Sequence, residues 1–486
     1  MRGSLASDKR GVIALLAVLL GAAFLTFSPS ALGAGRLETG VLASGSFYGR
    51  DADLAFQRTR NAGATVVRLD VSWREVAPTA PPGFDASDPA DPAYNWFDLN
   101  RLVQRAALHG LTPIITISGA PDWAERTAGG RVGTNSPDPV ELGRFAYAAA
   151  LRYSGAFGGL PRVRDWEVWN EANASFFLSP QNPNNPAASA DLYRRMVNEF
   201  AAGVHAVHAD NVVVAGGLFP FVLGHQEAQA IGPMTFMREL FCMGTNLKPR
   251  NNCGPPIHFD AWSHHPYTSG GPTHKADNPD SVSIGDLPRM RRLLSAAVRA
   301  NRIVHNGPVR FWVTEFSWDS NPPDQHGVPN QLLGRWVAEG LYRMWQSGVS
   351  LVTWFQLRDD AANGRPDNQV FQSGLYLRCS AGLACDSPKP ALTAFRFPFV
   401  AFRFGRRVRV WGRTPAGQAV KVSVQQRTGR RKWRKVAKLR PDGYGIFFRR
   451  LRLSRGGALR AVLPGGEASL GFSLRRPPDR TVSPFG

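Results

Sequence analysis

The sequence predicts an α/β protein: a (β/α)8 TIM barrel followed by a small all-β, sandwich-like domain. Between residues 37 and 397, short and nearly continuous apolar segments alternate with segments whose apolar residues recur every three or four positions. Eight such strand–helix units in roughly 360 residues are typical of a TIM barrel with enlarged loops. Beyond residue 398 the pattern becomes one of short strands separated by Gly, Pro and Asp turns, which is typical of a β-sandwich.

The eight expected barrel strands are almost uninterrupted in apolar residues, as strands covered on both faces should be. In chain order they are Val41–Ser44, Thr65–Val71, Leu111–Ile117, Val163–Asn170, Val212–Gly216, Ile257–Ser263, Val309–Thr314 and Leu351–Phe355. The alternative for such repeating units is a doubly wound open sheet, which normally has a Gly-rich phosphate loop after its first strand. Because this sequence has no such loop, it favours the barrel.

Amphipathic helices are expected between these strands, at Asn100–His109, Pro139–Ser154, Leu192–His208, Leu287–Asn301 and Leu332–Trp345. The longest loops that follow strands are rich in Pro, Asn, Gly and aromatic residues, namely Ala77–Trp96, Ala172–Ala190, Leu218–Pro256 and Tyr267–Asp286. Since the C-terminal ends of barrel strands carry the chemistry, we expect these loops to form a binding cleft. One of them contains a further helix, Pro233–Phe241.

The first 34 residues have the layout of a secretory signal peptide. Lys9 and Arg10 precede an apolar run from residue 12 to 27, and small residues at 31–34 suit cleavage. We therefore divide the chain into a signal peptide (1–34), a barrel (35–397) and a C-terminal β domain (398–486). Export predicts an extracellular or cell-surface location. The alternative is an uncleaved segment, which would anchor the protein in a membrane.

The C-terminal domain carries nearly all of the chain's net charge of +21. From Arg396 onward the chain holds 23 basic and 3 acidic residues, whereas the preceding part is close to neutral. Such a surface can bind an anionic polymer by releasing counterions. For an exported protein we expect an acidic cell-surface polysaccharide or anionic lipid rather than nucleic acid. The alternative is a solvated face without a partner.

The expected strands of this C-terminal domain are Arg407–Trp411, Val420–Gln425, Lys432–Leu439, Gly445–Leu451, Ala458–Val462 and Ala468–Leu474.

The four cysteines form two close pairs, Cys242 with Cys253 and Cys379 with Cys385. Because export permits disulfides, we expect two small loop-closing bonds, with four unpaired thiols as the alternative. Neither pair has the spacing of zinc ligands.

No metal site and no cofactor are predicted. The sequence has no nucleotide-binding loop. Three histidines close in sequence lack a carboxylate or Cys partner at helix spacing, namely His258, His264 and His265.

Two of the expected strands end on a glutamate, the fourth at Glu171 and the seventh at Glu315. Two carboxyl groups at the C-terminal ends of parallel strands can face each other across a cleft. Such a pair can cleave a glycosidic bond, because one protonates the leaving oxygen while the other attacks the sugar or activates water. Arg68 lies within an apolar strand, where an unpaired charge would be costly. We expect it to hold Glu315 ionised, and a structural salt bridge to Glu167 or Asp70 is the alternative.

Trp169–Glu171 on the fourth strand, Thr314–Glu315 on the seventh and Arg68 on the second resemble the clan A retaining glycoside hydrolases, most closely families 5 and 39. The resemblance covers the barrel and departs at Ala172, where these families usually have proline. It implies that Glu171 is the general acid/base and Glu315 the nucleophile, with carboxyl groups about 5–5.5 Å apart.

The resemblance also implies a set of sugar-binding residues. Asn170 would hydrogen-bond the sugar 2-hydroxyl, and His265 and Tyr267 would lie near the nucleophile. Trp354 on the eighth strand would stack on the sugar, with barrel packing as the alternative. Other aromatic residues in loops are candidates for further subsites, with packing as the alternative for each, namely Trp318, Trp73, Trp123 and Phe177.

The sequence therefore predicts an exported retaining glycosidase that cleaves O-glycosidic bonds, expected to be β, by double displacement. Its substrate would be a polysaccharide or oligosaccharide. The alternatives are a non-hydrolytic glycan-binding protein on the same barrel, or a transglycosylase using the same residues. Because the catalytic strands are complete before the basic domain, deletion of Arg406–Gly486 is expected to spare activity on a small glycoside.

Overall fold

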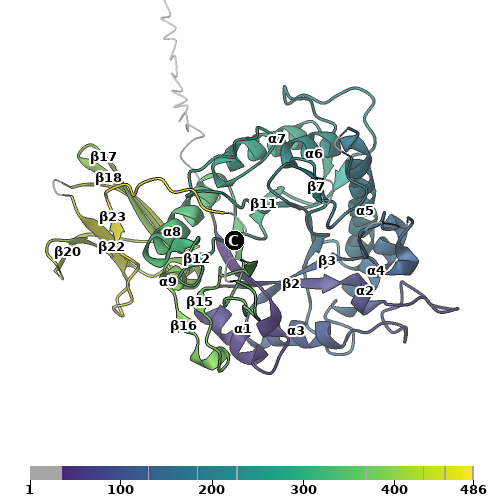
Figure 1. Cartoon of the computed structure of the whole chain (residues 1–486), viewed down its shortest axis with the longest axis horizontal. Helices are drawn as coiled ribbons and strands as arrows, with labels where there is room; N and C mark the ends of the chain where they lie inside the picture. The colour runs from purple at the N-terminus through teal and green to yellow at the C-terminus, as the bar shows by residue number, and fades with distance from the viewer. Residues whose placement is uncertain are drawn as a thin grey trace, which may run out of the picture. The chain divides into compact units, whose positions relative to one another are not determined.

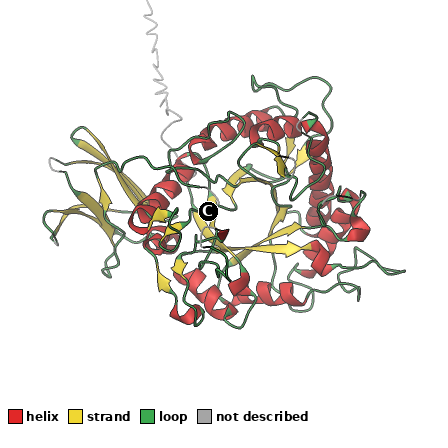
Figure 2. Cartoon of the chain, viewed as in Figure 1, coloured by secondary structure: helices red, strands yellow, loops and turns green. Residues whose placement is uncertain are grey.

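Eight parallel strands close into a barrel in the computed structural model, and helices surround it (Figures 1 and 2). The structure describes residues 35–483 except 128, 130, 183, 226–227, 367–368, 431 and 454–455. The predicted signal peptide lies outside these described residues. Around the barrel the strands follow the order β1 (Glu38–Leu42), β14 (Leu351–Trp354), β11 (Arg310–Val313), β9 (Ala261–His264), β5 (Val212–Leu218), β4 (Asp165–Val168), β3 (Thr112–Ser118) and β2 (Val66–Ser72).

The predicted TIM barrel is thus confirmed, and every strand lies within a few residues of its expected place. The sixth expected strand is interrupted: β8 (Ile257–His258) pairs with β10 (Ile303–Val304) outside the barrel, and β9 continues it inside. The break falls at Asp260, whose carboxylate accepts hydrogen bonds from the backbone amides of Val213 and Asn306. A side chain that takes over backbone amides in this way replaces part of a strand ladder.

The described helices include six that match the predicted segments, with ends that differ by a few residues, and three that were not predicted, at Ala52–Asn61, Trp73–Val76 and Pro390–Arg396. In chain order the described helices are α1 (Ala52–Asn61), α2 (Trp73–Val76), α3 (Phe97–Leu108), α4 (Pro139–Arg152), α5 (Pro186–Val207), α6 (Pro233–Phe241), α7 (Leu287–Arg299), α8 (Asn330–Gln346) and α9 (Pro390–Arg396). Helix α4 illustrates the local signals. The Asp138 side chain caps its N-terminus by accepting from the amides of Val140 and Glu141, and Pro139 occupies the first position.

The C-terminal residues form two antiparallel sheets, as predicted for an all-β domain. One contains β17 (Phe399–Phe404), β18 (Arg407–Arg413) and β21 (Ile446–Arg452). The other has the order β20 (Trp433–Leu439), β19 (Val422–Arg427), β22 (Ala458–Val462) and β23 (Phe472–Ser473).

This β module shares one hydrophobic core with the barrel. Trp411 of β18 is fully buried, and its ring lies 5.4 Å from that of Tyr342 and 5.5 Å from that of Trp345, both on α8. Gly334 of α8 allows a close approach, because a Cβ there would come within 2.6 Å of the Leu470 side chain. The module is therefore packed onto the barrel rather than tethered to it.

Both predicted cysteine pairs are disulfide-bonded, Cys242 with Cys253 and Cys379 with Cys385. Within the described residues, no helix combines the length and the apolar composition that a membrane crossing requires.

Candidate active site

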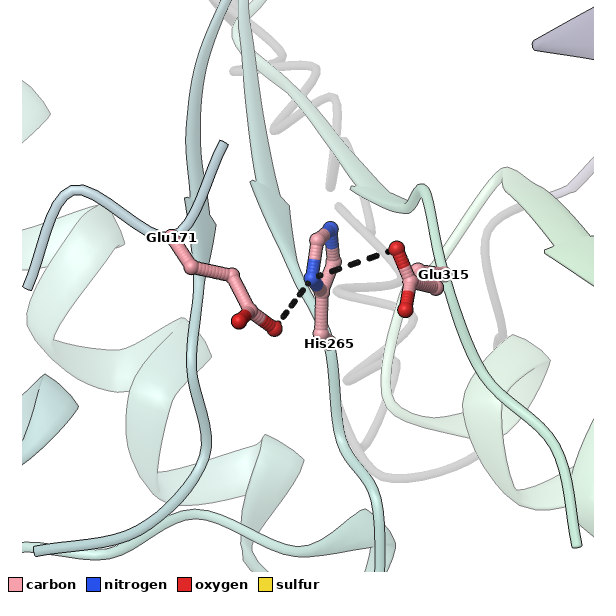
Figure 3. A group of neighbouring side chains, drawn as sticks. All are labelled: Glu171, His265 and Glu315. Atoms are coloured by element: carbon pink, nitrogen blue, oxygen red, sulfur yellow. Dashed lines mark hydrogen bonds and ion pairs between the residues drawn. The ribbon is translucent and has the colours of Figure 1, made fainter. Parts of the chain in front are cut away.

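Three side chains converge at the C-terminal end of the barrel (Figure 3). Glu171 follows β4, His265 follows β9 and Glu315 follows β11, and β9 is separated from β4 by β5 alone. One polar side-chain atom from each residue lies within 4.8 Å of the others. The sequence-predicted glutamate pair is therefore brought together, with His265 between its two members.

The backbone after β4 is bent to present Glu171. Trp169 and Glu171 have φ angles of 68° and 45°, in the left-handed region that residues other than glycine rarely adopt. The bend is fixed by hydrogen bonds from the Trp169 amide to the Ile117 carbonyl and from the Glu171 amide to the Gly217 carbonyl, at 2.8 and 2.9 Å. Such conformations cost about 1–3 kcal/mol each and concentrate at functional sites.

Arg68 lies beneath the pair, fully buried, and contacts five acidic or polar side chains, among them Thr116, whose hydroxyl oxygen accepts from Nε at 2.9 Å. Its Nη1 donates to Glu315 Oε2 at 3.0 Å and its Nη2 to Asn170 Oδ1 at 2.8 Å. Its Nε donates to Glu167 Oε2 at 2.8 Å, and Asp70 Oδ1 lies 3.3 Å from Nη2. Arg68 therefore makes both of the contacts expected from the sequence, the one with Glu315 and those with Glu167 and Asp70.

Glu167 is a site residue that the sequence analysis considered only as a partner of Arg68. It is fully buried inside the barrel. Besides Arg68, it accepts hydrogen bonds from the hydroxyls of Thr116, Ser263 and Thr314, each at 2.7 Å. All of its acceptor positions are thus used by donors on or just after four other barrel strands, β2, β3, β9 and β11. A glutamate in the middle of an apolar strand was the available signal, since a buried charge requires partners.

Glu315 is held by a donor on each of its two oxygens. The Tyr267 hydroxyl donates to Oε1 at 2.7 Å, and Arg68 donates to Oε2 at 3.0 Å. Burial raises the pKa of Glu315, and the Arg68 charge and the Tyr267 hydrogen bond oppose that rise. Both donors favour the ionised form.

The pKa of Glu171 is shifted in the same direction as that of Glu315, and further. Burial, followed by the negative charge of Glu315, raises the pKa of Glu171 well above its ordinary value. Its Oε1 lies 2.9 Å from His265 Nδ1. Burial and the neighbouring Arg68 charge lower the pKa of His265 well below its ordinary value, so the imidazole is neutral. Two carboxyl groups this close share a proton, and it belongs on Glu171.

With the imidazole neutral, the hydrogen-bond directions assign the same proton. The Thr314 hydroxyl donates to Glu167, because a carboxylate can only accept. Its oxygen, 3.2 Å from His265 Nε2, must then accept the N–H of the imidazole. A neutral imidazole with its hydrogen on Nε2 has a lone pair on Nδ1, so Glu171 must supply the hydrogen in their contact. The chain from Glu167 through Thr314 and His265 therefore selects the protonated form of Glu171.

A cavity of about 990 Å³ opens above these residues. Asn170, Glu171, Tyr267 and Glu315 line it, as do Asp70 and other polar residues after β2 and β3. Much of the remaining surface is apolar and aromatic. Its size is that of a ligand-binding pocket.

Trp354 and Trp318 do not lie on this cavity. Trp354 is fully buried, and its Nε1 donates to the Ser373 carbonyl at 2.8 Å. Trp318 is buried against Phe316 and donates from Nε1 to the Gly270 carbonyl at 3.0 Å. Burial thus favours the packing alternative for both. The aromatic ring that reaches the cavity from the end of β14 belongs to Phe355.

Of the remaining aromatic and histidine residues singled out from the sequence, one lines the cavity and the others are packed away from it. Phe177 lines the cavity. Trp73 is fully buried, and Trp123 packs edge-on against it with ring centroids 5.7 Å apart. His264 is fully buried, with Nε2 2.9 Å from the Val282 carbonyl, and burial lowers its pKa to about 4.

Among the described residues, Glu171, His265 and Glu315 are the one group of three whose ligand atoms could surround a metal ion. Two features oppose such a use. His265 Nδ1 is already engaged by Glu171, and the Arg68 guanidinium already neutralises Glu315. The donor set suits a proton-sharing pair better than a cation.

The fold is shared with a family 39 glycoside hydrolase from the gut symbiont Bacteroides cellulosilyticus WH2. That structure aligns with a TM-score of 0.52 and 17% identity, over 86% of this chain and 80% of that chain. The predicted resemblance to clan A glycoside hydrolases is thus confirmed at the level of the fold.

Two further solved structures align more loosely, and at these TM-scores neither likeness bears on the argument. SrfJ from Salmonella typhimurium aligns at a TM-score of 0.48 and 10% identity, over 87% of this chain and 92% of its own. A Bacteroidetes-affiliated GH5 cellulase aligns at 0.42 and 15%, over 70% and 85%. No protein-family model and no curated protein matches the sequence.

Proposed function

We propose that the protein is a retaining glycoside hydrolase in which Glu171 is the general acid/base and Glu315 the nucleophile. This proposal rests on one observation: the two adjacent carboxyl groups have different hydrogen-bond partners. Glu315 receives two donors that favour its ionised form, whereas Glu171 faces a neutral imidazole lone pair that favours its protonated form. A glycosidase needs this division between an acid and a nucleophile.

In the first step the proton of Glu171 moves to the glycosidic oxygen while a Glu315 oxygen attacks the anomeric carbon. The bond from that carbon to the leaving oxygen breaks, and a covalent glycosyl-enzyme forms. In the second step Glu171, now a carboxylate, removes a proton from water, which displaces Glu315 from the sugar. Asn170 Oδ1 is held by Arg68, so its NH₂ group is left to donate to a sugar hydroxyl.

The spacing of the pair supports retention over inversion. One oxygen of Glu171 and one of Glu315 lie within 4.8 Å. Inverting enzymes separate their carboxyl groups by about 6.5–9.5 Å to admit a water molecule, and retaining enzymes by about 5–5.5 Å. A transglycosylase would use the same first step and differ in whether water or a sugar enters second.

The test uses Glu315→Gln and Glu171→Ala on a panel of aryl glycosides. We expect Glu315→Gln to abolish turnover, because it removes the covalent intermediate. Glu171→Ala should lose about 10²–10⁴-fold with poor leaving groups and much less with good ones. Added azide should partly restore it by replacing the activated water. Exposed Glu199 on α5 offers a control in Glu199→Gln, which should retain full activity.

Binding without hydrolysis is the competing function. Full activity in Glu315→Gln would disprove the assignment of the nucleophile. Sugar binding by the wild-type protein without any turnover of the panel would favour the glycan-binding alternative.

We propose further that the basic β module binds an anionic cell-surface polymer. A cavity of about 850 Å³ lies where the module meets α8, and seven Lys or Arg side chains and two acidic ones line it. The Arg409 guanidinium lies 5.1 Å from the ring centroid of Phe404 and 5.9 Å from that of Phe448, and its buried Nε has no hydrogen-bond partner within the described part of the chain. A buried donor without a partner suits a ligand that supplies an acceptor.

Both disulfides support an extracellular or cell-surface location, because such bonds persist in oxidising compartments. Together with the signal-peptide pattern of residues 1–34, they lead us to propose that the protein is exported.

A further inference from the structure

The side of the cavity next to Glu171 is built from hydrophobic side chains. Apart from Asn170 and Glu171, the described cavity-lining residues of the loops after β4 and β5 are all apolar. We name these five residues the aromatic wall: Phe176, Phe177, Phe219, Phe221 and Leu223. Because a general acid protonates the leaving oxygen, the group that departs in the first step lies on this side of the cavity.

The phenylalanine rings of the aromatic wall form a continuous edge-to-face chain. The ring centroids of Phe176 lie 5.2 Å from those of Phe177 and 5.4 Å from those of Phe219, and Phe219 lies 5.9 Å from Phe221. Edge-to-face contacts at this spacing are favourable beyond simple burial. The rings therefore stabilise one another and present a single apolar surface.

The aromatic wall is also fixed relative to Glu171. Asn173, fully buried, donates from Nδ2 to the carbonyls of Phe219 and Ile231 at 2.9 and 2.8 Å, and accepts from the Phe219 amide at 2.8 Å. Trp169 Nε1 donates to the Phe177 carbonyl at 2.8 Å. These bonds tie the two loops to each other and to the bend that carries Glu171, so the apolar surface is preorganised.

The part of the cavity beside β2 and β3 is more polar. β2, α2 and β3 contribute Asp70, Ser72, Glu75 and Ser118 to its lining. Sugar hydroxyls find partners there, whereas a hydroxyl pressed against the aromatic wall would lose its water without replacement, which is unfavourable. The cavity thus offers a polar site for one sugar and an apolar site for whatever that sugar is attached to.

We propose that the substrate is a glycoside with an apolar aglycone, that is, a sugar linked through oxygen to an alkyl, aryl or lipid alcohol. The proposal rests on the proposed glycosidase function. The bond from the anomeric carbon to the aglycone oxygen breaks, that oxygen receives the proton of Glu171, and the alcohol leaves along the aromatic wall. Water then supplies the hydroxyl of the released sugar.

The test has two stages, so that the two proposals can fail separately. A screen of nitrophenyl glycosides first identifies the sugar, and no turnover of any of them would contradict the glycosidase function itself. Methyl, butyl, hexyl and octyl glycosides of that sugar are then compared with a disaccharide of the same linkage. We expect kcat/KM to rise with chain length, by up to about fourfold per buried methylene. A flat series, or preference for the disaccharide, would overturn the apolar aglycone alone.

Single-residue variants show which side of the cavity binds the aglycone. Phe176→Ser and Phe221→Ser should flatten the dependence of kcat/KM on chain length. Phe371→Ser, which alters an aromatic residue of the cavity on the β14 side, should leave that dependence unchanged. As a readout without turnover, octyl glycoside should bind Glu315→Gln more tightly than methyl glycoside in calorimetry, and Phe221→Ser should remove the difference. Equal flattening in Phe371→Ser would show that the aromatic wall is not the aglycone site.

Discussion

Glu167 shows how a residue that never reaches the cavity can direct its chemistry. It receives donors from the second, third, sixth and seventh barrel strands in chain order, through Arg68, Thr116, Ser263 and Thr314. Two of these donors also contact the site: Arg68 binds Glu315, and Thr314 accepts from His265. The same carboxylate therefore supports the ionised nucleophile and the protonated acid.

We predict that Glu167→Gln impairs the acid more than the fold. Without a carboxylate acceptor, Thr314 no longer has to donate to residue 167, and His265 can place its hydrogen on Nδ1 and donate to Glu171. That change, and the loss of a nearby negative charge, both lower the pKa of Glu171. The alkaline limb of the pH profile of kcat/KM, which reports this pKa, should move to lower pH. Turnover of substrates with poor leaving groups should fall about tenfold to hundredfold.

A matched control separates positioning from stability. Asp165 lies at the other end of the same strand, β4, and burial raises its pKa to about 6. Asp165→Asn should leave the alkaline limb in place. If Glu167→Gln lowers the melting temperature but keeps the wild-type pH profile, Glu167 has only a structural role.

At the scale of elements, hydrophobic periodicity was sufficient for the barrel, because both faces of each parallel strand are covered and each helix buries one stripe. It missed the helices α1, α2 and α9, and the strand β17, which follows the chain's exit from the barrel. In α1 polar residues outnumber apolar ones, and the other three segments are too short for a period to stand out. The interruption at Asp260 depends on side-chain hydrogen bonds that no periodicity contains.

The convergence of Glu171 and Glu315 was predictable, because the ends of barrel strands meet at one face. Arg68 was expected from its charge within an apolar strand, and Asn170, His265 and Tyr267 were expected from the family resemblance. Trp354 illustrates what is not predictable. Successive side chains of a strand point to opposite faces, so a one-residue difference at the end of β14 puts Trp354 in the packing layer and Phe355 on the cavity.

Two substitutions at the end of β14 test this assignment. Trp354→Ala should lower the free energy of unfolding by about 3–5 kcal/mol, because it empties a buried site between Phe316 and Phe395. Phe355→Ala should change stability much less and should raise KM for glycosides, since the ring lines the cavity. Denaturant unfolding and steady-state kinetics measure the two effects. The reverse pattern, with KM raised in a stable Trp354→Ala, would restore Trp354 as the sugar-stacking residue.

For the whole molecule, the shared core changes what deletion of the β module should do. The sequence led us to expect that removing Arg406–Gly486 spares the barrel, because all catalytic strands precede it. Deletion would however expose the face of α8 that carries Tyr342 and Trp345 against Trp411. It would also remove the Val482 amide, which donates to the carbonyl of Ser269 near Tyr267.

We therefore predict that the chain lacking residues 406–486 is insoluble or unfolded and has no activity on a small glycoside. Exposed apolar surface of this kind drives aggregation. Size-exclusion chromatography and circular dichroism of the truncated chain, measured beside the full chain, provide the check. A monomeric, fully active truncation would show that the barrel is stable alone.

The charge of the module has to be tested with the module in place. The cavity beside α8 gathers cations from separate segments of the chain, including Lys275 and Arg409. By contrast, Arg434 and Lys438 lie exposed on β20, away from it.

If the cavity binds an acidic polymer such as polygalacturonate, its affinity should fall steeply between about 50 and 200 mM salt. Lys275→Ser with Arg409→Ser should reduce the logarithmic salt slope by about one unit for each contact removed. The matched double variant Arg434→Ser with Lys438→Ser should leave the slope unchanged. Equal losses in both would mean that the whole basic surface binds diffusely, and an absence of binding at 50 mM salt would mean that the charge is only solvated.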